Sequence, residues 1–249
     1  MKKMIDLHCH YNHGVDGDTV TNVLYHADLP FLQAERERNG IVATAFSSFC
    51  SVITTENIQR ENEHLFQLAQ KNAWIYQWAV LDPRQKELFK QVGALLQEKK
   101  TLGIKIHSPM HQYSINDYAD EIFAFVNEQK TCVLMHPDAI PDMAKHADKY
   151  PNMKLIIAHI GSEEHIQAVK DAKYGNIFLD TSGIASSKNN IIEYAVEQIG
   201  SEKIFFGTDT YACAFQRGRI EFADISKPAK KNILFQNAKR EFWQLKNIK

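Results

Sequence analysis

The chain contains 249 residues, of which 44% are hydrophobic and 24% are charged. This ordinary globular composition argues against a disordered, collagen-like or coiled-coil protein. The 29 lysines and arginines nearly balance the 30 aspartates and glutamates, so the formal net charge is −1 and gives no general attraction to nucleic acid or anionic lipid. The length suits one α/β barrel of about 250 residues, although two small domains would also fit.

The cysteines and the amino terminus favour a cytoplasmic protein. The four cysteines form no C-x-x-C pair, which fits a reduced compartment. Residues 1–6 lack the apolar core of a signal peptide, and no apolar run reaches the roughly 18 residues of a spanning helix. We therefore expect a cytoplasmic location and neither membrane nor nucleic acid as a partner.

Eight short apolar runs predict β-strands. Each run is continuous rather than alternating in polarity, which is typical of strands buried on both faces of a parallel sheet. In chain order, the runs span residues 4–7, 41–46, 74–81, 102–106, 132–135, 155–158, 177–179 and 204–206.

Between these runs lie amphipathic segments with apolar residues at helical spacing. They span residues 56–71, 85–99, 116–128 and 190–199, and a closing helix is expected over 227–245. The repeated alternation predicts a (β/α)8 TIM barrel or a large doubly wound sheet. No G-x-G-x-x-G motif or P-loop supports a nucleotide-binding doubly wound fold. We predict a single α/β barrel domain over residues 1–249.

Histidines and carboxylates follow these strands at their carboxyl ends. In a barrel, all these ends open on the face that holds the active site, so residues far apart in sequence would converge there. A doubly wound sheet would instead spread them along an open edge. The residues concerned are His8, His10, His107, His136, His159, Asp180 and Asp209.

The spacing of His8 and His10 has a direct physical meaning. Side chains at positions i and i+2 of a strand face the same way, so both imidazoles point into the barrel and Cys9 points out toward the helices. Two neutral imidazoles on one face suit zinc, iron or nickel. An isolated H-x-H pair could equally be a polar barrel plug, but the further ligand types at strand ends favour a metal.

The order of these motifs resembles the amidohydrolase superfamily of metal-dependent TIM barrels. The chain is most similar to amidohydrolase family 2, which includes the aminocarboxymuconate-semialdehyde decarboxylases, and the resemblance runs from Ile5 to about Phe242. The motifs that carry it are Ile5-Asp6-Leu7-His8-Cys9-His10, Val133-Leu134-Met135-His136, Ile157-Ala158-His159-Ile160-Gly161, Phe178-Leu179-Asp180-Thr181-Ser182-Gly183, Phe206-Gly207-Thr208-Asp209 and Asn232-Ile233-Leu234-Phe235-Gln236-Asn237-Ala238.

This resemblance implies a metal site and two catalytic residues. His8, His10 and His136 would bind the metal, and Asp209 would be a further ligand or the base that takes a proton from metal-bound water. His159 would act beside the substrate as acid, base or electrophile, although this position binds a second metal in binuclear relatives. We expect one divalent metal per chain, with zinc preferred over manganese, while some relatives work without metal.

Lys105 leaves three interpretations open. Strand alternation places Lys105 and His107 on one face, and Lys105 points into the barrel if its isoleucine neighbours pack under the helices. It could then be carboxylated and bridge two metals, as the strand-four lysine does in binuclear relatives. It could also bind an anionic group of the substrate, or pair with Asp6.

Several residues are candidates for substrate binding. An arginine at a barrel mouth suits a carboxylate because its fork binds two oxygens, whereas a loop arginine is more often a solvated surface charge. The candidates are Lys105, His107, Arg84, Tyr113 and Arg217, with His111 and Ser182 as further neighbours. The histidines expected on the surface or on helix faces are His13, His26, His64, His146 and His165.

We therefore predict a metal-dependent hydrolase that acts on an amide, lactone or ester of a small carboxylic acid. The alternative is a lyase, a metal-dependent decarboxylase or hydratase of a small carboxylic acid, because the fold does not determine the chemistry. A phosphoesterase of the D-x-H-x-H type is less favoured, since no matching glutamate follows a strand. The full set of ligand types argues against an inactive scaffold, and the resemblance also suggests a homodimer.

Overall fold

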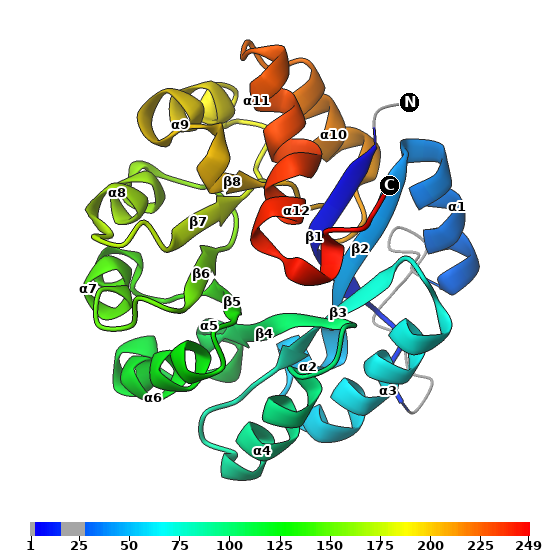
Figure 1. Ribbon diagram of the computed structural model, residues 1–249, viewed down its shortest axis with the longest axis vertical. Helices are drawn as coiled ribbons and strands as arrows, with labels where there is room; N and C mark the ends of the chain where they lie inside the picture. The colour runs from blue at the N-terminus through cyan, green and yellow to red at the C-terminus, as the bar shows by residue number, and fades with distance from the viewer. Residues whose placement is uncertain (1–2, 16–27) are drawn as a thin grey trace.

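The computed structural model describes residues 3–15 and 28–249, and His26 lies outside these residues. Eight parallel strands pair in chain order, and helices surround them (Figure 1). The strands are β1 (Met4–Tyr11), β2 (Ile41–Ser48), β3 (Ile75–Val80), β4 (Thr101–His107), β5 (Cys132–His136), β6 (Lys154–Ile157), β7 (Ile177–Asp180) and β8 (Ile204–Phe205). All eight predicted strands are present, and the predicted (β/α)8 barrel is confirmed.

The chain just after β8 closes the barrel against β1. The amide of Leu7 donates to the carbonyl of Phe206 at 2.9 Å, and the amide of Thr208 donates to the carbonyl of His8 at 3.0 Å. Asp209 also forms a parallel bridge with Cys9. This closure places the first strand beside the segment that carries the last candidate ligand.

The helices differ in how plainly the sequence marks them. The apolar residues of α3 and α6 share one face, whereas α1 and α10 have no strongly apolar face and were not predicted. The helices are α1 (Leu29–Asn39), α2 (Phe49–Ile53), α3 (Ile58–Lys71), α4 (Lys86–Leu95), α5 (Ser108–His111), α6 (Ile115–Glu128), α7 (Met143–Ala147), α8 (Glu163–Asp171), α9 (Ile191–Ile199), α10 (Cys213–Glu221), α11 (Lys227–Lys231) and α12 (Asn237–Glu241). None of the described helices is both long and apolar enough to cross a membrane.

The predicted closing helix is broken into shorter pieces. A π-helical turn, Asn232–Gln236, separates α11 from α12, and a 3-10 turn follows at Trp243–Leu245. The Asn237 side chain is buried and donates to the carbonyls of Ser201 and Ile204, each at 2.7 Å. The last segment of the chain is therefore a series of short helical pieces along the base of the barrel, and not the single helix that the sequence predicts.

Apolar side chains fill this end of the barrel. The ring of Phe242 lies 5.8 Å from that of Trp78 and 5.9 Å from that of Phe205. Figure 1 shows α12 crossing the same end. The ionisable side chains therefore gather at the opposite end, where the parallel strands finish.

Candidate metal centre

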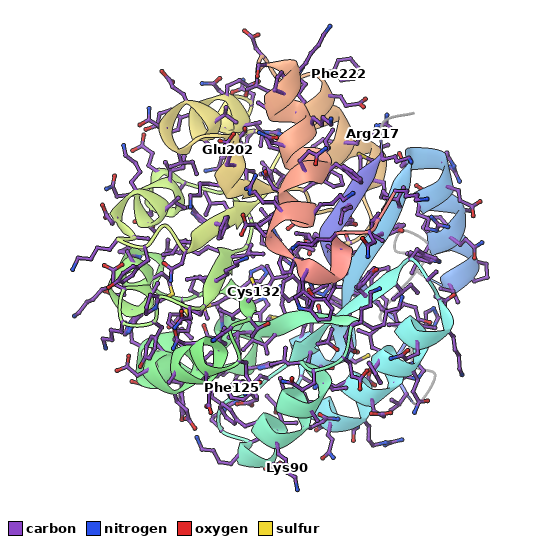
Figure 2. All side chains as sticks on the ribbon, viewed as in Figure 1. Lys90, Phe125, Cys132, Glu202, Arg217 and Phe222 are labelled. Atoms are coloured by element: carbon purple, nitrogen blue, oxygen red, sulfur yellow. The ribbon has the colours of Figure 1, made fainter. Side chains whose placement is uncertain are left out.

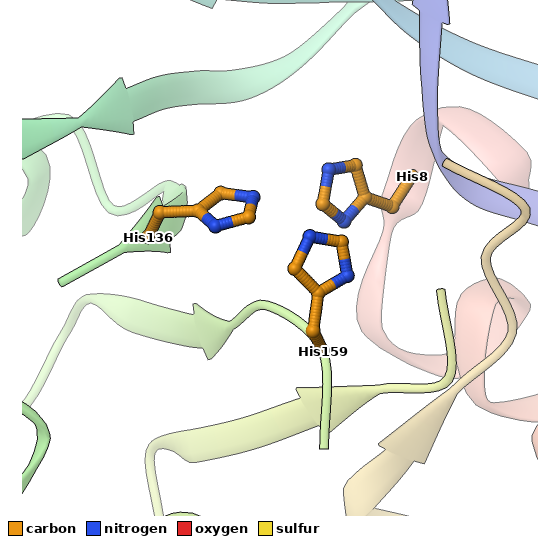
Figure 3. Close-up of side chains that lie close together, drawn as sticks. All are labelled: His8, His136 and His159. Atoms are coloured by element: carbon orange, nitrogen blue, oxygen red, sulfur yellow. The ribbon is translucent and has the colours of Figure 1, made fainter. Parts of the chain in front are cut away.

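Three imidazoles from distant parts of the chain face one another at the carboxyl ends of the strands (Figure 3). His8 belongs to β1, His136 ends β5, and His159 follows β6. The ring of His159 lies 4.3 Å from the ring of His136 and 5.0 Å from the ring of His8. One nitrogen from each ring lies within 4.8 Å of the other two, which is close enough for a shared metal ion.

A second group shares His8. His8, His10 and Asp209 each offer a ligand atom, and these atoms also lie within 4.8 Å of one another. His10 Nε2 is 3.3 Å from Asp209 Oδ1, and His10 Nδ1 is 2.9 Å from Ser47 Oγ. His8 thus belongs to both groups of possible ligands. Of the other expected ligands, His10 and Asp209 lie in one group, and His136 lies in the other beside His159.

The backbone adopts unfavourable conformations where it presents two of these side chains. His159 has φ 59° and Asp209 has φ 64°, in the left-handed region that residues other than glycine seldom adopt. Such strain persists where the surrounding structure requires it, and it is common at functional sites. Gly183 makes room for His159, because a Cβ atom at Gly183 would lie 2.6 Å from His159 Nδ1.

Asp180, which ends β7, supports His8 from behind. Its Oδ2 atom lies 2.8 Å from His8 Nδ1, and both side chains are buried. Burial alone would raise the pKa of Asp180, but the interactions with His8 and Ser182 outweigh burial and hold this pKa well below its usual range. The ionised Asp180 accepts a hydrogen bond from the His8 Nδ1–H, which leaves the lone pair on His8 Nε2.

Lys105 donates a hydrogen bond to this lone pair on His8 Nε2. The buried Lys105 ammonium lies 2.8 Å from His8 Nε2. Burial lowers the pKa of Lys105 to about 8, while Asp180 and Asp209 oppose this shift. The alternative in which Lys105 pairs with Asp6 is not formed among the described residues, since the Asp6 carboxyl group accepts from Thr208 Oγ1 at 2.5 Å and from the amide of Thr208 at 3.1 Å.

The imidazoles of His8, His10 and His136 are uncharged near neutral pH. Burial and the neighbouring Lys105 lower the pKa of His8 to about 3, and burial also lowers the pKa of His10 and of His136. In contrast, burial would raise the pKa of Asp209, but the interactions with His10 and the neighbouring histidines together outweigh burial and keep this pKa well below its usual range. Neutral imidazoles and an ionised carboxylate are the forms that bind a metal, so the donor set fits a divalent cation.

Two of the substrate-binding candidates lie beside this centre. His107, at the end of β4, stacks on His136 with ring centroids 4.1 Å apart and an interplanar angle of 6°. His107 Nδ1 accepts from the amide of Met110 at 3.3 Å, so the proton is on Nε2. Lys105 contacts His8 as described above. These two side chains provide donors next to the candidate ligands.

The other candidates have protein partners. Arg84 Nε and Nη2 donate to the two carboxylate oxygens of Asp82, at 2.9 and 2.8 Å, and the Arg84 guanidinium lies over the Tyr113 ring. His111 Nε2 is 2.8 Å from the carbonyl of Ser51. These contacts join the segments that follow β2, β3 and β4, rather than leaving the Arg84 fork free.

Arg217 and the remaining histidines belong to neither candidate ligand group. Arg217 donates to the carbonyl of Asn39 and pairs with Glu221, so its contacts join α10 to the end of α1 (Figure 2). His13, His64 and His146 are half-buried in loops or on helices. His165 is buried on α8, where its Nδ1 lies 3.0 Å from Ser162 Oγ.

The sequence places Asp180 at a strand end but does not indicate its role. Its position beside His8 depends on the distance between β7 and β1 in the closed barrel, which a local sequence pattern cannot predict. Ser182 was considered only as a substrate neighbour, whereas its side chain is buried against the histidines. Spacing along a strand predicts which side chains face the mouth of the barrel, but it does not predict which residues hydrogen-bond to those side chains.

The sequence profile of the amidohydrolase family matches residues 5–242. The chain belongs to this family. The resemblance inferred from the motifs is therefore confirmed, and the chain is an amidohydrolase-superfamily enzyme. No curated protein matches the chain.

Solved structures similar to this amidohydrolase share its fold at low sequence identity. The dihydroxybenzoic acid decarboxylase from Polaromonas sp. JS666, with bound manganese and 2-nitroresorcinol, has a TM-score of 0.75 and 18% identity over 99% of this chain and 98% of that chain. A probable 2-pyrone-4,6-dicarboxylic acid hydrolase from Acinetobacter baumannii, with bound citric acid, has a TM-score of 0.71 and 16% identity over 96% and 99%.

A third similar structure is an amidohydrolase from Burkholderia multivorans with bound zinc. Its TM-score is 0.73, with 16% identity over 96% of this chain and 99% of that chain. Several other similar structures are decarboxylases of 2,6-dihydroxybenzoate or 5-carboxyvanillate. At these identities, the comparison shows that this chain shares the fold of these structures.

Proposed function

We propose that the chain is a metal-dependent hydrolase of an amide, lactone or ester of a small carboxylic acid. The observation that carries this proposal is the convergence of neutral imidazoles and an ionised Asp209 at one end of the barrel. His8, His10, His136 and Asp209 would hold the ion. A divalent ion held there would supply Lewis acidity and lower the pKa of a bound water to about 7.

Asp209 and His159 would carry the proton transfers. The low pKa of Asp209 keeps its carboxylate ionised, which is the form required of a proton acceptor. His159 Nδ1 faces the carbonyl of Ser182 at 2.7 Å, so Nδ1 is protonated and Nε2 can take up a proton and return it to the leaving group. Lys105 and the Nε2–H of His107 would bind an anionic group of the substrate.

The contacts of His8 support one metal ion per chain. Both ligand groups include His8, and its Nδ1 proton is shared with Asp180, so only one lone pair remains for a cation. The imidazole-rich set favours zinc, with manganese as the alternative. This count also favours an unmodified Lys105 over a carboxylated lysine that bridges two ions.

A decarboxylase of a small carboxylic acid is the second candidate, with a hydratase as a related alternative. It is favoured by the similar structures that act on aromatic acids. The same ligands would serve it, and the two candidates differ in what leaves the substrate. Turnover of lactones, amides or esters would support hydrolysis, whereas release of CO2 from a hydroxybenzoate-like acid would support decarboxylation.

The first experiment is metal analysis of the purified protein by plasma mass spectrometry, with His8→Ala beside it. We expect about one equivalent of zinc or manganese in the native protein and loss of that metal in the variant. Two equivalents would place Lys105 among the ligands and overturn the single-ion proposal. No metal in the native protein, even after incubation with zinc and manganese, would contradict the metal-dependent function.

A further inference from the structure

The hydroxyl of Ser182 lies between the rings of His8 and His159. Its Oγ atom is 2.8 Å from His8 Nδ1 and 2.9 Å from His159 Nδ1. Ser182 lies two residues beyond the end of β7 and has no exposed surface. The hydroxyl therefore contacts two functional rings without being able to touch a substrate itself.

The hydrogen bonds around Ser182 determine which ring nitrogens carry protons. The hydroxyl donates its one proton to Asp180 Oδ1, because an ionised carboxylate only accepts. The Ser182 oxygen then has only lone pairs to offer the two rings. Each ring must therefore donate from Nδ1.

Two further acceptors agree with this assignment. His8 Nδ1 also faces Asp180 Oδ2 at 2.8 Å, and His159 Nδ1 also faces the carbonyl of Ser182 at 2.7 Å. Both oxygens can only accept. The two rings thus share one tautomer, with the proton on Nδ1 and the lone pair on Nε2.

The backbone holds Ser182 closely in place. A Cβ atom at Gly207 would lie 2.9 Å from both Ser182 Cβ and His8 Cβ, and a Cβ atom at Gly183 would lie 2.6 Å from His159 Nδ1. The amide of Ser182 also donates to Asp180 Oδ1 at 2.8 Å. The hydroxyl therefore has one position, and that position sets the relative orientation of the two rings.

We propose that Ser182 is a positioning residue that holds His8 and His159 in the same tautomer and orientation, so that both present Nε2 to the metal centre. The use of these Nε2 atoms rests on the proposed function, whereas the tautomers do not. Groups behind metal-binding histidines commonly change metal affinity by 10–100-fold when they are removed.

The test compares Ser182→Ala with Ser51→Ala. Ser51 is a matched control because it is also wholly buried, while its Oγ has no hydrogen-bond partner. We expect zinc affinity, measured by competition with a chelator, to fall roughly 10–100-fold in Ser182→Ala and to stay within about threefold in Ser51→Ala. A Ser182→Ala affinity within that same threefold range would overturn the proposal.

Nitrogen-15 NMR of the histidine rings, recorded on the metal-free full chain, gives a readout that a merely structural role would not move. We expect His8 and His159 to be protonated at Nδ1 and unprotonated at Nε2. Both Nδ1–H resonances should shift together in Ser182→Ala and stay in place in Ser51→Ala. Unshifted resonances in Ser182→Ala, or a proton on Nε2 of either native ring, would overturn the proposal.

The native-protein spectrum needs no variant, so the proposal remains testable if Ser182→Ala does not fold. It also separates the two proposals. A native chain that takes up no metal but shows the expected tautomers would contradict the proposed function and leave the tautomer assignment supported.

Discussion

At the residue scale, the Lys105 ammonium and a metal ion would compete for the same lone pair, on His8 Nε2. Lys105 Nζ lies 2.8 Å from His8 Nε2, and Nε2 is also the atom that Asp180 leaves free for a metal. A cation that binds His8 must displace the Lys105 ammonium from this position. Lys105 therefore opposes metal binding while it supplies a positive charge for an anionic substrate.

Replacing Lys105 with methionine separates these two effects. Lys105→Met removes a charged hydrogen bond of about 1.5–3 kcal/mol to His8, so we expect zinc affinity to rise roughly tenfold or more. The KM for an acidic substrate should rise as well, because the cation is lost. Chelator competition measures the affinity and steady-state kinetics measures KM. Weaker zinc binding in Lys105→Met would show that Lys105 supports the metal site instead.

At the scale of elements, the segment after β7 determines where His159 lies. Gly183 has φ 60°, and a Cβ atom there would lie 2.6 Å from His159 Nδ1. The strand end itself is marked by apolar residues, but the turn that follows it is not. The sequence could predict that His159 faces the mouth and could not predict what holds its ring.

Gly183→Ala should therefore displace His159. We expect a loss of about 1–3 kcal/mol of unfolding free energy from the left-handed backbone and the close contact, and a fall in activity. Gly218→Ala is the matched control, because Gly218 lies within α10 and a Cβ atom there would meet nothing within 4 Å. The control should gain about 0.5–1 kcal/mol. Chemical unfolding measures both changes, and equal effects of the two variants would contradict this account.

Helix α8 carries a buried histidine that should make the protein sensitive to acid. Burial lowers the pKa of His165 from 6.5 to about 4. The unfolded chain therefore binds a proton between pH 6.5 and about 4 that the folded chain does not, so the stability present above this window is lost as the pH falls through it.

The pKa shift of His165 corresponds to roughly 3 kcal/mol of unfolding free energy across this pH window. His165→Gln should flatten the fall in unfolding free energy between pH 7 and pH 4. His146→Gln is the control, since His146 is half-buried on α7. An unchanged pH dependence in His165→Gln would show that other groups cause the acid sensitivity.

At the scale of the whole molecule, the candidate ligands come from both ends of the chain. His8 and His10 lie on the first strand, and Asp209 follows the last. Unfolding separates these residues, so a metal that binds them stabilises only the closed barrel. We also predict one domain over residues 1–249 and a homodimer. Light scattering measures the mass in solution and so tests the dimer.

Zinc should therefore raise the unfolding temperature. At a free zinc concentration of 100 times Kd, the expected stabilisation is about 2.7 kcal/mol, or roughly 5–10 °C for a chain of this size. Thermal unfolding with zinc and with a chelator measures the difference. His8→Ala should remove the shift, and a shift that persists in this variant would place the stabilising ion elsewhere.

The sequence alone determined the barrel and the residues that reach its mouth. Apolar runs and helical periodicity are short-range patterns, and the alternation along a strand shows which side chains share a face. This was sufficient for the eight strands and for His8, His10 and Lys105 facing inward. The weakly patterned helices α1 and α10 were missed for the same reason, because they have no strongly apolar face.

Only the tertiary structure decided which of these residues meet. Barrel closure brings Asp209 to His10, and the neighbouring strands β5 and β6 put His136 beside His159. The turn after β7 places Ser182 between two rings, while Arg84 is paired with Asp82. These contacts depend on loop conformations and on distances across the barrel, which join residues far apart in the chain and leave no periodic pattern in the sequence.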